Sequence, residues 1–283
     1  MIEEFLKKVG AKVDSSAPIE YGTQYRVSRG AEQAIVNVYR GKKGPRVVVQ
    51  KNTPLADELR ALFGVKKAQE QSPDWEAWAG SDESGKGDYF GPLTVAAVAL
   101  TRKQAGELAS WGVRDSKTMT DDVAAGLDRR IRAACAFELV GWMPEEYNRR
   151  HEEVRNVNRL LGEAHAEALQ GALAKLPAAQ AAVTDQFGDE SYVADALAAR
   201  GVTIELIQRP KADETDLAVA AASIVARAAF VRGIAKLGKA WGMPLPKGAG
   251  PDVIAAARAF LKRHGRDALG GVAKLHFKTT ASL

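Results

Sequence analysis

The sequence has almost no cysteine: Cys135 is the only one in 283 residues. A disulfide needs two cysteines, so an internal disulfide is excluded, and we expect a reducing compartment in which this thiol is a small buried apolar side chain. Residues 1–8 carry acids where a signal peptide needs bases, and no apolar run reaches transmembrane length. We therefore expect a cytoplasmic protein that does not enter a membrane.

The usual signatures of zinc, serine and P-loop chemistry are also missing. The four histidines have no ligand spacing with one another or with Cys135, so no zinc site is predicted, and no nucleophile elbow is present. Residues 80–86 match a P-loop, but Gly87 replaces the Ser or Thr that would hold Mg²⁺. The acids inside this stretch would also repel phosphates, which disfavours the P-loop interpretation.

The net charge of +5 is unevenly distributed. Residues 1–70 contain 13 bases and 8 acids, whereas the remainder is balanced, and residues 227–278 contain 11 bases and only two acids. Basic flanks around an acidic centre favour a protein that neutralises phosphates and binds metal between them. Solvated helix faces would give the same counts, and this alternative stays open.

The first part of the chain predicts a small domain of strands. Helices are expected at residues 3–9 and 56–63, and antiparallel strands at 21–28, 33–39 and 46–50. The strand region carries seven bases and three tyrosines: Arg26, Arg29, Arg40, Lys42, Lys43, Arg46, Lys51, Tyr21, Tyr25 and Tyr39. Such a sheet favours sequence-independent binding to a nucleic-acid backbone, although tyrosines are also common in plain sheet cores. We predict a binding domain at 1–68, a linker at 69–78 and a second domain at 79–283.

The second domain alternates strands and helices. Strands are expected at residues 93–100, 137–142, 181–185 and 202–207, and helices at 121–137, 158–176, 191–200 and 215–237. Residues 93–100 are nearly all apolar, as in a strand covered on both faces. The pattern predicts an α/β fold with a mixed or parallel sheet.

Two adjacent acids, Asp82 and Glu83, precede a glycine-rich turn. Neighbouring side chains of a strand point to opposite faces, so these two can share a site only where the strand ends or bends. We expect Gly85 and Gly87 to supply that bend and to let backbone N–H groups approach a ligand. A polar hairpin with one capping acid is the alternative.

Further acids follow later elements. Asp185 ends a buried strand, where α/β sheets place their ligands. Asp213, Glu214 and Asp216 cluster at the start of an apolar helix, where acids are favoured as caps, so only one of them need be catalytic. Four carboxylates from distant segments could hold two Mg²⁺ or Mn²⁺ ions and support phosphodiester hydrolysis.

The stretch Asp82-Glu-Ser-Gly-Lys-Gly-Asp-Tyr-Phe-Gly-Pro resembles the opening motif of ribonuclease HIII, within the type 2 ribonuclease H family. The resemblance continues through Arg114-Asp-Ser-Lys117, Asn158-Arg-Leu-Leu with His165, Thr184-Asp-Gln-Phe-Gly188, Lys211-Ala-Asp213 with Val219-Ala-Ala-Ala-Ser-Ile-Val-Ala-Arg227, Pro246-Lys-Gly-Ala-Gly250 and Lys274-Leu-His-Phe-Lys-Thr-Thr. It covers residues 79–280.

This resemblance implies a ribonuclease H-like fold behind a small TATA-box-binding-protein-like domain. It implies a two-metal endonuclease that cuts the RNA strand of RNA/DNA hybrids and leaves 5′-phosphate and 3′-hydroxyl ends. The implied catalytic and metal-binding acids are Asp82, Glu83, Asp185 and Asp213. The implied substrate-binding residues are Ser84, Gly85, Lys86, Gly87, Ser116 and Lys117, with the glycine loop recognising 2′-hydroxyls.

Two other functional hypotheses remain: a non-catalytic hybrid-binding or duplex-binding protein whose acids are caps, and a nucleotide hydrolase. The absence of an obvious apolar assembly stripe suggests a monomer. The last tyrosine is Tyr192, so the C-terminal tyrosine with which type 2 enzymes read a single ribonucleotide is missing. We therefore expect weak cleavage at an isolated ribonucleotide in DNA.

Overall fold

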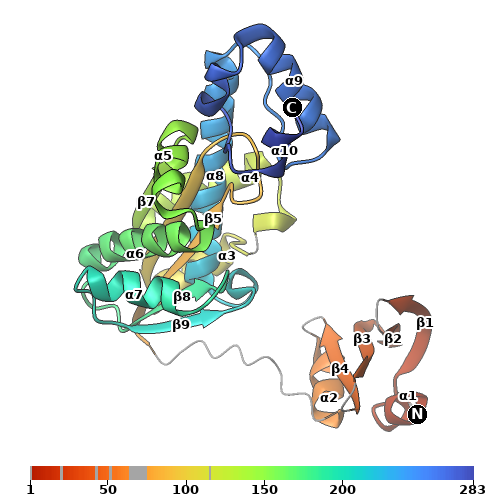
Figure 1. Ribbon diagram of the computed structural model, residues 1–283. Coiled ribbons are helices and arrows are strands. Elements are labelled where there is room, and N and C mark those ends of the chain that lie inside the picture. Colours follow the sequence, from red (N-terminus) through yellow and green to blue (C-terminus); the bar gives the residue numbers. More distant parts are fainter. Residues whose placement is uncertain (1, 20–21, 42–43, 51–52, 64–74, 115) are drawn as a thin grey trace. The chain divides into compact units, whose positions relative to one another are not determined.

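The computed structural model describes residues 2–19, 22–41, 44–50, 53–63, 75–114 and 116–283. Contacts divide the chain into two compact units, Met1–Ser72 and Pro73–Leu283 (Figure 1). We call them the N-terminal and C-terminal units. Residues 69–74 of the predicted linker lie outside the described residues, as does Asp115 of the Arg114–Lys117 motif.

The N-terminal unit is a four-stranded antiparallel sheet in the order β1-β2-β3-β4, with two helices. Its elements are α1 (Ile2–Lys8), β1 (Lys12–Ile19), β2 (Gly22–Arg29), β3 (Glu32–Gly41), β4 (Gly44–Gln50) and α2 (Pro54–Leu62). Its core includes Leu6, Val36 and Leu59, all buried. The sequence patterns predicted every element except β1, which is mostly exposed and contains Pro18. Apolar alternation is weak in such an edge strand.

The predicted basic and aromatic surface of this unit is described only in part. Arg26 is exposed, whereas Arg29 forms ion pairs with Glu32 (2.9 Å) and Glu58 (2.7 Å). Tyr25 is half-buried and packs against the core. Tyr21, Lys42, Lys43 and Lys51 lie outside the described residues, as do the side chains of Tyr39, Arg40 and Arg46. At Tyr25, therefore, the alternative of a sheet-core tyrosine fits.

The C-terminal unit is built on a five-stranded mixed sheet in the order β7-β6-β5-β8-β9. Its strands are β5 (Ala77–Ser84), β6 (Leu93–Thr101), β7 (Ala136–Trp142), β8 (Ala181–Asp185) and β9 (Glu205–Arg209). Its helices are α3 (Arg102–Ser110), α4 (Asp121–Ala134), α5 (Pro144–Val154), α6 (Val157–Lys175), α7 (Ser191–Ala199), α8 (Leu217–Ala240), α9 (Pro251–His264) and α10 (Lys278–Ala281), with short 3-10 turns at Ser116–Thr118, Ala212–Glu214 and Asp267–Gly271. β6 pairs antiparallel with both β5 and β7, whereas β8 pairs parallel with both β5 and β9.

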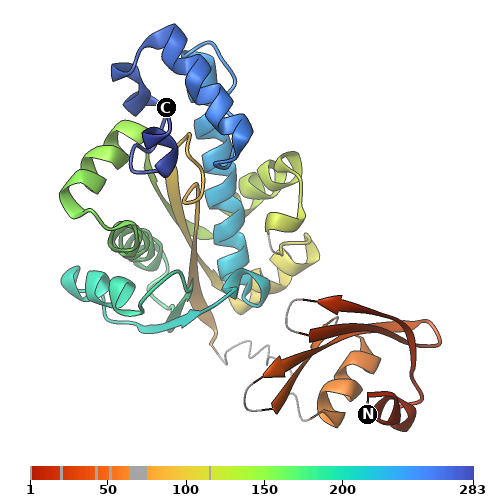
Figure 2. The same cartoon turned by 45° about the vertical axis from the view of Figure 1, so that its right-hand side comes forward.

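Helices cover both faces of this sheet (Figure 2). On one face, Ala96, Val98 and Leu100 of β6 pack in a cluster with α3, α4 and α8. On the other, Val95 and Ala97 pack against α6 and α7. This confirms that residues 93–100 form a strand covered on both faces. Cys135 is buried, and burial raises the pKa of its thiol to about 11, which suits an unreactive apolar role.

The expectation that no apolar run reaches transmembrane length is wrong for α8, which passes the length and composition test for a membrane span within the described part of the chain. Its most apolar stretch is 72% buried inside the unit, so core packing accounts for its composition. Beyond the sheet, the second half of α8 packs with α9 and the loop after β5 in a third cluster that includes Phe90, Phe230 and Phe260.

Candidate active site

The predicted acid pair lies on the central strand of the sheet. Asp82 and Glu83 are two of the last three residues of β5, and the Asp82 carboxylate accepts a hydrogen bond from the Glu83 backbone N–H (2.8 Å). β8 runs parallel to β5 with Thr184 opposite Ser81, and it ends at the following residue, Asp185. Acids of two neighbouring strands therefore meet at one edge of the sheet, where α/β folds place their ligands.

The turn after β5 depends on one glycine. Gly85 has φ +91°, and a Cβ there would lie 2.2 Å from the Pro92 carbonyl oxygen. This conformation and close approach require glycine. Gly87 also lies in this turn, but it has no positive φ and has open space where a Cβ would lie, so the backbone requires glycine at Gly85 and not at Gly87.

The three clustered acids before α8 have three different environments. Asp216 is the N-cap of α8 and accepts hydrogen bonds from Ala218 N (2.9 Å) and Val219 N (3.0 Å). Glu214 is exposed and pairs with Lys211 at 2.6 Å. Asp213 is buried at 1% exposure in the 3-10 turn. Capping therefore accounts for the acid at position 216, and a surface ion pair accounts for the acid at position 214. Neither role accounts for the buried Asp213.

This 3-10 turn is joined to the end of β8. The backbone N–H of Ala212 donates to Asp185 Oδ1 at 2.9 Å, which brings Asp213 next to the strand acids. The charge of Asp213 contributes to raising the pKa of both Asp82 and Asp185. All four predicted acids therefore belong to one electrostatic cluster.

The acids have shifted pKa values. Burial, then the charge of Glu83, raises the pKa of Asp82 well above its usual range. Burial also raises the pKa of Asp185. For Glu83 burial acts in the same direction, but the hydrogen bond from His165 and the charge of Lys86 outweigh it and lower the pKa. Such opposed shifts within one cluster are typical of functional sites.

His165 supports Glu83 from α6. It is fully buried, with Nδ1 2.8 Å from the Ser81 hydroxyl and Nε2 3.2 Å from Glu83 Oε2. A neutral ring accepting from Ser81 and donating to Glu83 satisfies both contacts. Both ring nitrogens of His165 therefore have partners within the fold.

Two properties of the acids suit a hard divalent cation: they offer carboxylate oxygens as ligands, and one of these oxygens has no hydrogen-bond partner in the described part of the chain. Asp213 Oδ1 is buried and has no hydrogen-bond partner among the described residues, as expected of an oxygen reserved for a cation. No three acid, histidine or cysteine side chains of the described chain form a ready-made metal cage. Ammonium groups lie against the acids instead: Lys117 is 2.9 Å from Asp213 Oδ2, and Lys86 is 3.7 Å from Glu83 Oε1.

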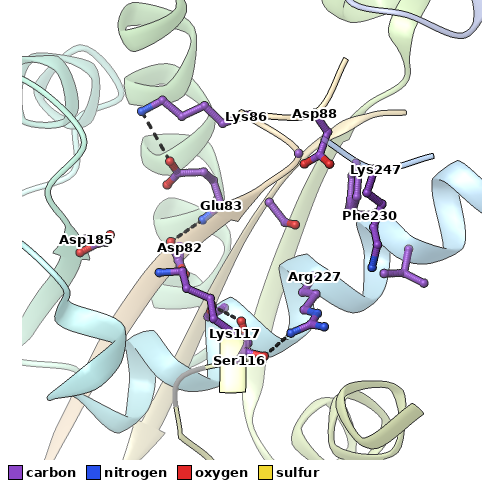
Figure 3. A pocket seen from close by; sticks show the side chains of 15 residues that line it. Asp82, Glu83, Lys86, Asp88, Ser116, Lys117, Asp185, Arg227, Phe230 and Lys247 are labelled. Atoms are coloured by element: carbon purple, nitrogen blue, oxygen red, sulfur yellow. Dashed lines mark hydrogen bonds and ion pairs between the residues drawn. The ribbon is translucent and has the colours of Figure 1, made fainter. Parts of the chain in front are cut away.

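A cleft of about 350 Å³ opens in front of the acids (Figure 3). Every predicted site residue except the more deeply buried Asp213 lines it, including residues 84–87 of the glycine loop and the Ser116–Lys117 pair. The cleft is therefore bordered by acids, by the glycine loop and by three lysines, Lys86, Lys117 and Lys247. This is a suitable place for a phosphodiester beside metal ions.

The sequence reasoning assigned no role to several residues of this cleft. Ser223, Arg227 and Phe230 come from α8, and Lys247 from the segment after it. Ser223 donates to Ser116 or accepts from it at 2.9 Å, and Arg227 donates to the Ser116 carbonyl oxygen. In the sequence, only one feature indicated a functional role for Ser223, Arg227 and Lys247. They lie within the motifs that carry the resemblance to the ribonuclease family.

Comparisons with known proteins agree with this arrangement. A family model described as Ribonuclease HII matches residues 79–280. The ribonuclease HIII of Protochlamydia amoebophila is 40% identical over 200 residues, which is 71% of this chain and 66% of that protein. That of Chlamydia pneumoniae is 43% identical over 203 residues, 71% of this chain and 67% of that protein. These matches span about two thirds of the length of the two curated relatives.

The likeness extends to a solved structure. The crystal structure of Bst-RNase HIII in complex with Mn²⁺ aligns with a TM-score of 0.69 and 26% identity, covering 99% of this chain and 94% of that one. The N-terminal antiparallel sheet and the mixed sheet that follows it in the chain thus form the expected ribonuclease HIII type of fold. The chain belongs to the ribonuclease HII family of endoribonucleases, with ribonuclease HIII proteins as its relatives.

Proposed function

We propose that this protein is a metal-dependent endoribonuclease that hydrolyses the RNA strand of RNA/DNA hybrids. The observation that carries the proposal is the buried carboxylate cluster at the edge of β5 and β8, with Asp213 Oδ1 unpartnered beside a cleft that a nucleic-acid backbone can enter. Family membership and the Mn²⁺ complex of a structural neighbour support it.

Asp82, Glu83, Asp185 and Asp213 are the residues that would hold Mg²⁺ or Mn²⁺, two ions per site. The bound ions would supply Lewis-acid chemistry, activating water and stabilising the leaving oxygen, with 5′-phosphate and 3′-hydroxyl products. His165 fixes the Glu83 carboxylate, and the Ala212 N–H fixes that of Asp185. Burial, which raises the pKa of Asp82, makes this carboxylate costly unless a cation neutralises it.

The glycine loop, Lys86 and Lys117 would bind and orient the substrate. Residues 84–87 line the cleft, where their backbone groups would contact the 2′-hydroxyls that distinguish RNA from DNA. Lys117, 71% exposed beyond its contact with Asp213, would contact a phosphate together with Ser116. In the N-terminal unit, the bases of the sheet would add sequence-independent contacts to the hybrid.

The experiment is a cleavage assay on an end-labelled RNA/DNA hybrid with Mg²⁺, Mn²⁺ or EDTA, alongside Asp82→Asn. We expect internal cuts in the RNA strand that require metal and fall by orders of magnitude in the variant, with 5′-phosphate ends on the products. No cleavage in either metal with hybrid binding retained would favour the binding-protein hypothesis. Hydrolysis of free nucleotides would favour the hypothesis of a nucleotide hydrolase.

A further inference from the structure

A second hollow continues from the catalytic cleft along the end of α8. It has a volume of about 720 Å³ and is lined by Asp121, by one side of α8 (Val231, Ile234, Ala235, Gly238 and Lys239) and by residues 242–247. Val231 and Lys247 line both hollows, so the two meet at these side chains. We call the second hollow the α8 groove.

Two cations share one acid where the hollows meet. Lys247 Nζ lies 2.8 Å from Asp121 Oδ2, and the Arg227 guanidinium lies 2.7 Å from Asp121 Oδ1. We call these three residues the junction site. Lys86 and Lys117 each have a carboxylate partner of their own, whereas the junction site keeps a surplus positive charge. In Figure 3, Arg227 and Lys247 lie on the side of the cleft opposite Asp185.

The junction site is tied to the proposed substrate loops on both sides. Arg227 donates to the backbone oxygen of Ser116. On the other side, Gly248, which follows Lys247, donates its N–H to Asp88 Oδ1 at 2.6 Å and accepts from Tyr89 N at 2.8 Å. The Arg227 guanidinium is therefore held to the Ser116 turn, and the backbone next to Lys247 is held to Asp88 and Tyr89, which follow the glycine loop.

We propose that the junction site binds a backbone phosphate of the nucleic acid and guides the strand from the catalytic cleft into the α8 groove. Lys247 is half exposed, and an ammonium group has three donors, so it can reach a phosphate while it stays near Asp121. The groove adds an exposed Lys239 and apolar walls at Met243 and Leu245, which suit a charged backbone with apolar sugar faces. It lies in the segment 227–278, which has 11 bases and two acids.

This inference rests on the proposed function and specifies how the same substrate leaves the cleft. Binding of a labelled RNA/DNA hybrid is measured by fluorescence anisotropy over a series of salt concentrations, in EDTA, for the full chain, Lys247→Met and Lys236→Met. Lys236 is the matched control because it is exposed on α8, the helix along the groove, but lines neither hollow. The logarithm of the association constant decreases linearly with the logarithm of the salt concentration. We expect this dependence to become less steep by about one in Lys247→Met and to stay unchanged in Lys236→Met. Equal slopes for the two variants and the wild type would overturn the proposal.

Asp121→Asn gives an independent readout, because the carboxylate competes with a phosphate for both cations. We expect this variant to bind the hybrid several-fold more tightly, with the gain lost in the double variant with Lys247→Met. Weaker binding in Asp121→Asn would contradict the proposal. Cleavage by the wild type in Mg²⁺ is assayed in parallel, so that failure of the junction site alone is distinguished from failure of the ribonuclease function.

Discussion

At the scale of single residues, Asp213, Glu214 and Asp216 show how similar side chains are separated by their surroundings. The Asp216 carboxylate accepts hydrogen bonds from the first backbone N–H groups of α8 and from Trp78 Nε1 at 3.1 Å. Glu214 is balanced by Lys211 at the surface. Of these three acids, only Asp213 combines burial with an unpartnered oxygen.

We therefore expect Asp213→Asn and Glu214→Gln to behave differently, although the residues are adjacent. Asp213→Asn should lower the cleavage rate by orders of magnitude, because a metal-binding charge is lost, while hybrid binding in EDTA is retained. Glu214→Gln should leave the rate within about twofold of the wild type, since exposed ion pairs contribute little. Comparable losses in both variants would remove Asp213 from the proposed metal site.

Some of the site could be predicted from the sequence, because its signals are local. The adjacency of Asp82 and Glu83, the glycines behind them and the strand before Asp185 are all visible in short stretches. The links from His165 to Glu83 and from Arg227 and Lys247 to Asp121 are not local, since they join segments 82, 106 and 126 residues apart. Side chains of such distant segments meet only in the folded chain.

At the scale of elements, a strap formed by residues 272–274 holds the loop that follows β5. Phe90 pairs with Ala273 in an isolated β-bridge, and the buried Lys274 ammonium donates to the carbonyl oxygens of Asp88 (2.7 Å) and Gly91 (2.8 Å). Burial lowers the pKa of Lys274 to about 7.

This lowered pKa makes stability depend on pH. Between pH 7 and the usual lysine pKa of about 10.4, the unfolded chain binds the proton that the folded chain has lost, so this group makes the free energy of unfolding rise with pH. In Lys274→Met the slope should fall by up to about 1.4 kcal/mol per pH unit. Two unpaired carbonyls should also destabilise the variant, by about 1–3 kcal/mol each.

Denaturant unfolding from pH 7 to 10 measures both effects. Lys278→Met is the matched control, because Lys278 is exposed on the neighbouring α10, and its profile should follow that of the wild type. If the free energy of unfolding of Lys274→Met changed with pH as steeply as that of the wild type, the buried ammonium would not titrate in this range.

Element prediction succeeded where apolar periodicity was strong and failed where it was weak. The alternate packing of β6 into two cores explains its continuous apolar run. The strand predicted at residues 202–207 begins only at Glu205, because Val202 and Ile204 pack on the α6 side before pairing starts. β1 was missed because its exposed polar residues give no alternation, although pairing with β2 holds it in the sheet.

At the scale of the whole molecule, each unit has a core of its own, so we expect the C-terminal unit to cleave the hybrid alone, with weaker substrate binding. Removal of residues 1–72 should raise KM several-fold at physiological salt and reduce the salt slope of hybrid binding, while kcat changes little. Steady-state kinetics on one hybrid at two salt concentrations tests this. An unchanged KM would argue against the N-terminal unit as a binding domain.

Substrate choice also belongs to this scale. No tyrosine follows Tyr192, which lies on α7 within hydrogen-bond reach of Asn156 (3.5 Å). We expect DNA with a single embedded ribonucleotide to be cut at least about tenfold more slowly than DNA with a run of four, corresponding to about 1.4 kcal/mol in the barrier. Equal rates for the two duplexes in Mg²⁺ would contradict this expectation.

The strap has a consequence for biosynthesis. Lys274 and Gly91 are 183 residues apart, so the loop beside the acids lacks its support until translation has passed the strap. A nascent chain that has already made its acid strands cannot yet hold the substrate loop in place. Hybrid cleavage should therefore appear late in synthesis, and joining such distant segments should make this region among the last to fold.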